Sequence, residues 1–160
     1  MLKTESPELR SPENVPSLDR TNLSQRSCDL LRSELAKIRT AWTQYQETRD
    51  RDGVYHYLDA VFGLVGKWRR LGCAKSRARR ALRLQKIQPQ GKVEPFAALI
   101  ACTGKLDRRT LSKWSRALRY VAQVKKDREG LARFMQGQGG INACASLFSR
   151  IGRQLRSQSQ

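Results

Sequence analysis

Apolar residues recur at the spacing of an α-helix along most of this 160-residue chain. In the clearest case, Leu31, Leu35, Ile38 and Trp42 follow one another at intervals of four, three and four residues, which places them on one side of a helix. No pair of segments shows the alternating pattern of paired strands. The sequence therefore predicts an all-α protein of about six or seven helices.

The first two helices are predicted to form a long N-terminal hairpin over residues 24–70. One helix is expected to start at Ser24 as its N-cap and to end near Arg49, and the next to carry apolar residues from Val54 to Trp68. The break between them, 50–53, contains Asp52 as an expected cap. Amphipathic helices joined by so short a break usually pack antiparallel.

The remaining helices are predicted over 71–87, 96–102, 107–124, 128–136 and 141–155, which together form a basic helical body over 71–156. Leu71 is expected on the inner face of the helix 71–87. Asp107 is the expected cap of the helix 107–124, and Tyr120 is expected on its outer face. The apolar run 96–102 fits a buried helix or a strand, and we favour a helix because no companion strand exists. The proline-rich, polar residues 1–23 are predicted to be a disordered leader, and 157–160 a frayed tail. One helical domain, 24–156, is expected between them.

The positive charge of the chain is concentrated in its later part. The formal net charge is +18, yet residues 24–59 hold equal numbers of acidic and basic side chains. Between Ala60 and Val93 there are ten basic residues and no acidic one. A surface of this kind attracts polyanions, and a nucleic-acid backbone is the commonest partner able to neutralise it.

Two groups of basic residues are predicted to bind nucleic acid. The first surrounds the helix 71–87, where the cations lie opposite a face of alanines and where phosphate contacts are expected. Arginine also offers a planar fork for phosphate or guanine. Its members are Lys67, Arg69, Arg70, Lys75, Arg77, Arg79, Arg80, Arg83 and Lys86.

The second group lies on the helix 107–124, opposite the apolar residues Leu111, Trp114, Leu118 and Val121. It consists of Arg109, Lys113, Arg116 and Arg119, and we expect these residues to enter a DNA groove. The segment 95–124 would then be a helix-turn-helix, with 96–102 as the supporting helix. The segment 128–155 has a similar outline, but its glycine turn favours a simple helical hairpin.

The predicted function is a non-enzymatic nucleic-acid-binding protein, with duplex DNA favoured, that acts as a small regulator or accessory factor, for example in transcription. One alternative is an interaction module, an adaptor or inhibitor, whose basic face docks on an acidic partner protein. Another is an RNA-binding component that uses the same cations. Trp68 and Trp114 lie among cations and are able in principle to stack on bases, but both fall on buried stripes and are expected in the core.

Catalytic and cofactor chemistry has little support in the sequence. The four cysteines are widely separated and lack the paired spacing of a zinc site, so neither a metal nor a cofactor is expected. His56 is the only histidine, and the acidic residues near the break at 50–53 are better explained as helix caps than as magnesium ligands. No phosphate-binding glycine loop is present. The chain is therefore predicted not to be an enzyme.

Further expectations concern assembly and location. The stripe Leu31, Leu35, Ile38 and Trp42 is long enough to serve as a homodimer seam. No run approaches the roughly 18 apolar residues of a membrane span, and the N-terminus lacks an apolar signal core, so no membrane is expected as a partner. The predicted location is the cytoplasm or a bacterial nucleoid.

Overall fold

The computed structural model describes residues 18–89, 91–126 and 128–158. Within these ranges the chain forms helices and no strand, which confirms the predicted all-α fold class. The seven helices are α1 (Leu18–Thr48), α2 (Arg51–Arg70), α3 (Ala74–Leu84), α4 (Pro95–Thr103), α5 (Arg108–Val124), α6 (Leu131–Gly137) and α7 (Ile141–Ser157).

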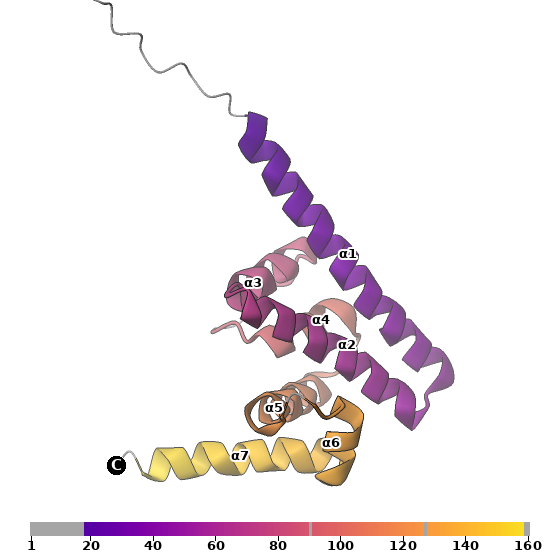
Figure 1. The fold of residues 1–160 in the computed structure, drawn as a ribbon, viewed down its shortest axis with the longest axis vertical. Coiled ribbons are helices and arrows are strands. Elements are labelled where there is room, and N and C mark those ends of the chain that lie inside the picture. Colours follow the sequence, from indigo (N-terminus) through magenta and orange to yellow (C-terminus); the bar gives the residue numbers. More distant parts are fainter. Residues whose placement is uncertain (1–17, 90, 127, 159–160) are drawn as a thin grey trace, which may run out of the picture.

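Helices α1 and α2 run side by side and antiparallel, joined by the turn at 49–50 (Figure 1). The predicted stripe on α1 packs against Tyr57, Leu58 and Val61 of α2, all of them fully buried. The start of the helix was predicted too late, because α1 begins at Leu18 and Ser24 lies inside it. Residues 18–23 are therefore helical rather than part of a leader, and residues 1–17 lie outside the described residues.

The four residues predicted to form a homodimer seam do not lie on the surface of the protein. Leu31, Leu35, Ile38 and Trp42 are each at most 8 % exposed, and they belong to the core of this same chain. Side chains packed in this way against α2 and α4 leave too little apolar surface to form a seam with a second copy. The seam has the spacing of a coiled coil because it is one half of an intramolecular hairpin.

Helix α4 is the apolar segment whose pattern fitted either a helix or a strand, and the choice of a helix is confirmed. Its start is set by Glu94, whose carboxylate accepts hydrogen bonds from the backbone N–H groups of Phe96 (3.2 Å) and Ala97 (2.8 Å). Pro95 follows at the first helical position, where its missing N–H costs nothing. Leu99 and Ile100 are then fully buried among α1, α2 and α5.

Helix α5 begins at its predicted cap, since Asp107 accepts a hydrogen bond of 2.9 Å from the Thr110 N–H. Helix α7 packs along α5, below it in Figure 1. The short helix α6 meets α7 at a corner instead of running back along it, so the helical hairpin favoured for 128–155 is wrong. The polypeptide turns this corner at Gly139 and Gly140, both of which have positive φ.

The end of α3 has the same hydrogen-bond pattern as the ends of α2 and α6. In each, two backbone N–H groups just past the helix reach back to carbonyls of its last turn, and the first of these two residues adopts positive φ. That residue is Gly72 after α2 and Gly139 after α6, but it is Lys86 after α3, at φ 55°. Leu71, predicted to lie on the inner face, is 65 % exposed because α2 has already ended there.

Candidate nucleic-acid interface

The outer face of α3 keeps part of the first predicted group of cations in solvent. Arg79, Arg83 and Lys86 line one hollow of about 470 Å³, whose other wall is the loop from Gln88 to Val93. All three side chains are exposed, and so are Arg70 and Lys75 nearby. The structure thus brings three of the predicted phosphate-binding residues to one hollow, and no acidic residue in the described part of the chain lines it.

Two other members of that group are paired inside the protein. Glu34 of α1 is only 8 % exposed, and its carboxylate lies 2.7 Å from Lys67 Nζ and 3.6 Å from the Arg77 guanidinium. The indole N–H of Trp68 donates to the same carboxylate at 3.2 Å. Trp68 itself is 1 % exposed, so its expected place in the core is confirmed. Lys67 and Arg77 therefore stabilise the contact of α1 with α2 and α3, and their contact with phosphate stays a prediction.

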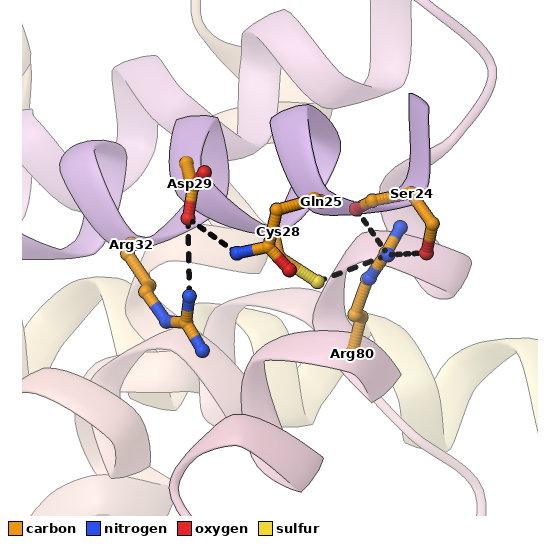
Figure 2. A network of polar contacts seen from close by, with 6 residues as sticks. All are labelled: Ser24, Gln25, Cys28, Asp29, Arg32 and Arg80. Carbon is orange, nitrogen blue, oxygen red and sulfur yellow. Dashed lines mark hydrogen bonds and ion pairs between the residues drawn. The ribbon is translucent and has the colours of Figure 1, made fainter. Parts of the chain in front are cut away.

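Arg80 is also directed inward, toward α1. Figure 2 shows its guanidinium donating to the carbonyl and hydroxyl oxygens of Ser24 and to the sulfur of Cys28, at 3.1–3.2 Å. The same guanidinium also donates to the Ser27 hydroxyl at 3.0 Å, so that both terminal nitrogens are used. Arg80 thus holds the first turns of α1, and its contact with phosphate stays a prediction.

Arg69 lies over the ring of Phe96, with its guanidinium carbon 4.7 Å from the ring centroid. Phe96 in turn stacks on Phe62, with their rings 5.9 Å apart. A guanidinium on an aromatic face is held by the ring quadrupole while its edge stays hydrated. Arg69 remains exposed, but its direction is fixed by α4 rather than by the α3 surface.

The second predicted group is divided by the packing of α7 on α5. Lys113 and Arg116 line a groove between these helices, and the Arg116 guanidinium donates to the Ser149 hydroxyl at 2.9 Å. Arg119 stacks on Phe148 of α7, 4.4 Å from the ring centroid. Arg109 is exposed on the first turn of α5 and does not line the groove. Since α7 covers part of this face, α5 does not stand out as a recognition helix, and Tyr120, expected outside, is 7 % exposed.

The α5–α7 groove contains cations that the sequence analysis did not select. Arg150 and Arg153 line the same hollow of about 460 Å³ as Lys113 and Arg116. Arg51 lines an adjoining hollow that shares Lys113, and Arg156 lines another that shares Arg116. The signal for them was present in the sequence: Asn142, Ser146, Arg150 and Arg153 recur at helical spacing opposite the buried Cys144.

The groove has the composition of an anion-binding surface. The three hollows share lining residues and therefore adjoin one another, and no acidic side chain among the described residues lines any of them. The small polar side chains of Asn142 and Ser146 also line the groove and supply neutral hydrogen-bond donors. Its six cations are Arg51, Lys113, Arg116, Arg150, Arg153 and Arg156.

Two titratable side chains of the core, Tyr57 and Cys102, are kept in their neutral forms by burial. Burial raises the pKa of Tyr57 to about 12, although its hydrogen bond with Thr103 (2.9 Å) opposes the shift. Burial likewise raises the pKa of the Cys102 thiol to about 11, with Arg39 opposing. Both groups are therefore neutral near pH 7 and are not available as nucleophiles. Among the residues that the structure describes, no three His, Cys, Asp or Glu side chains form a group that could hold a metal ion.

Comparison of the chain with protein-family models, with curated proteins and with solved structures finds no match. The helices within the described ranges include none that is long and apolar enough to cross a membrane.

Proposed function

We propose that this chain is a non-enzymatic nucleic-acid-binding protein that holds duplex DNA through phosphate contacts in the α5–α7 groove. The observation that carries the proposal is the groove itself, in which three adjoining hollows are lined by six cations and, among the described residues, by no carboxylate. Five of its cations lie on the packed helices α5 and α7, and Arg51 lies at the start of α2. Folding therefore already brings these cations together before a ligand binds, which lowers the entropic cost of binding. The exposed cations of α3 provide a second, smaller contact.

This function is that of a small regulator or accessory factor in the cytoplasm or nucleoid. Phosphate contacts give affinity and register but carry no sequence information. Base contacts would have to come from the polar side chains of α7, such as Asn142 and Ser146, which face the groove. We therefore expect binding to depend strongly on salt and weakly on sequence.

The first experiment measures the binding of a random-sequence duplex DNA against salt concentration. If the six groove cations neutralise about six phosphates, the log–log slope is about −5. No binding below micromolar Kd at low salt would overturn the proposal and favour an acidic protein partner. A duplex RNA of equal length that competes better than DNA would redirect the proposal to RNA.

The second experiment places the contact in the groove. The double variant Arg150→Glu/Arg153→Glu reverses two exposed charges on α7 and is expected to weaken duplex binding about 100-fold, because each charged hydrogen bond to phosphate is worth about tenfold. The matched control, Arg26→Glu/Arg133→Glu, makes the same change in net charge at exposed positions outside the groove. Equal losses in the two variants would mean that only total charge matters.

A further inference from the structure

A hollow of about 520 Å³ lies between α1, the end of α4 and the segment that follows α3, and the nucleic-acid groove does not use it. Its α1 wall consists of Arg39, Trp42, Thr43 and Gln46, which share one helix face. Gln85, Ile87, Ala101 and Lys105 complete most of the lining. The volume lies within the range of small-ligand sites, about 300–1,000 Å³.

The lining combines three kinds of surface. Trp42, Ile87 and Ala101 contribute apolar area. The amides of Gln46 and Gln85 each offer both a donor and an acceptor. Arg39 and Lys105 contribute positive charge, and none of the described acidic residues lines the hollow.

Contacts within the protein fix the position of Arg39 and of the floor of the hollow. Arg39 donates to the Cys102 carbonyl at 3.2 Å with one terminal nitrogen, which fixes the guanidinium at the end of α4 and leaves its other donors unused. Gly104, which also lines the hollow, packs closely against Tyr57 and Trp42: a Cβ at this position would lie 3.0 Å from Tyr57 Oη and 3.3 Å from Trp42 Cε3. The Cys102 thiol, buried beside the hollow, is neutral and adds no negative charge.

These three surfaces match the three parts of a nucleotide. A base needs apolar contact for its faces and paired donors and acceptors for its edge, which glutamine amides supply. Its phosphate needs cations that are not already neutralised by carboxylates. We propose that this hollow binds one nucleoside monophosphate unit, with the base toward Gln46 and Gln85 and the phosphate toward Arg39 and Lys105.

The unit has two possible sources, a free nucleotide or an unpaired nucleotide of a nucleic-acid strand. Ile87 lines both this hollow and the cationic hollow of Arg79, Arg83 and Lys86, so the two sites share a wall. A strand held by α3 is therefore placed to insert one unpaired nucleotide here. Binding of an unpaired nucleotide from a strand rests on the proposed function, whereas binding of a free nucleotide does not.

The test is calorimetric titration of the full chain with AMP, adenosine and inorganic phosphate. AMP is expected to bind at one site and about tenfold more tightly than either part alone, because each part makes only a share of the contacts. The variants Gln46→Leu and Gln85→Leu should each weaken AMP about three- to tenfold, and Lys105→Gln about as much. The matched controls are Gln44→Leu and Lys37→Gln, which are exposed positions on α1 outside the hollow.

The outcomes separate this proposal from the general function. The proposed nucleotide site is overturned if AMP does not bind, even if duplex DNA does. It is also overturned if AMP affinity is the same in Gln46→Leu, in Gln85→Leu and in the control Gln44→Leu. AMP binding that needs Gln46 and Gln85, without any duplex binding, supports the pocket and overturns the nucleic-acid function. Competition of AMP by a duplex with an unpaired 3′ end, but not by a blunt duplex, identifies the strand as the source. A lack of competition by both identifies the free nucleotide.

Discussion

The two ends of this molecule use their cations in opposite ways. At the α1–α3 end, Lys67 and Arg77 are paired with the buried Glu34, and Arg80 is bonded to the first turns of α1. At the α5–α7 end, the cations line a groove in which the described residues place no carboxylate. The difference shows that the local density of basic residues in a sequence does not decide which of them reach a ligand. One acid, more than thirty residues away along the chain, changes the role of two cations.

The largest expected effect tests whether the cations near Glu34 serve stability. Glu34→Gln keeps the shape of the side chain but removes its negative charge. Arg77 Nη1 is buried and has no hydrogen-bond partner within the described ranges, so in this variant its positive charge would no longer be balanced. We expect a loss of about 3 kcal/mol in unfolding free energy in urea, reduced from that of a fully buried pair because Lys67 is half exposed. Glu47→Gln, on the exposed side of α1, is the control. An unchanged midpoint for Glu34→Gln would show that the pairing is not structural.

The next effect ranks the two ends as binding surfaces. The double variant Arg79→Glu/Arg83→Glu reverses two cations of the α3 hollow, and we expect it to weaken duplex binding about tenfold, less than reversal in the groove because fewer cations gather there. Helicity by circular dichroism should stay unchanged, since both side chains are exposed. A loss larger than that of Arg150→Glu/Arg153→Glu would reverse the ranking and make α3 the main surface.

A smaller effect separates neighbours on α3. Arg80→Met removes the hydrogen bonds to α1, and we expect about fivefold faster hydrogen exchange of the amides near Ser24 and Cys28, equivalent to about 1 kcal/mol of local stability. Arg79→Met, one residue away and exposed, should leave that exchange unchanged while weakening duplex binding. Identical behaviour of the two variants would remove the distinction between inward and outward cations on this helix.

The smallest effect concerns Lys86. At φ 55° a lysine side chain is strained, whereas glycine is favoured in this position after a helix. Lys86→Gly is therefore expected to raise the unfolding free energy by about 0.5–1 kcal/mol and to weaken duplex binding slightly. Lys92→Gly, an exposed lysine of the loop after α3, supplies the control for charge. A destabilised Lys86→Gly would show that the lysine stem contributes packing that outweighs the strain.

Most of the fold follows from periodicity, because core positions repeat with the helix. The buried stripes of α1, α2 and α5 and the cap at Asp107 were all predicted at or near their observed positions. The start of α1 was missed because residues 18–23 carry no strong apolar repeat of their own. The dimer seam was misjudged because one amphipathic face looks the same whether its partner is α2 or another copy.

The candidate site was less predictable than the fold. Spacing identifies which cations share a face of one helix, but it does not reveal which other helix packs against that face. Arg119 was selected although Phe148 covers it, and Arg153 was passed over although it lines the groove. Both results depend on the packing of α7 against α5, a contact between distant segments that local patterns do not contain.

The crowding of like charges between α5 and α7 also affects the protein when nothing is bound. Lys113 and Arg116 on one helix face Arg150 and Arg153 on the other, so the two helices repel each other across the groove that their apolar sides close. Added salt should therefore raise the melting temperature of the free protein while it lowers affinity for a polyanion. A bound polyanion would also neutralise the charges that repel each other, and the stability of the α5–α7 pair would therefore be highest in its presence.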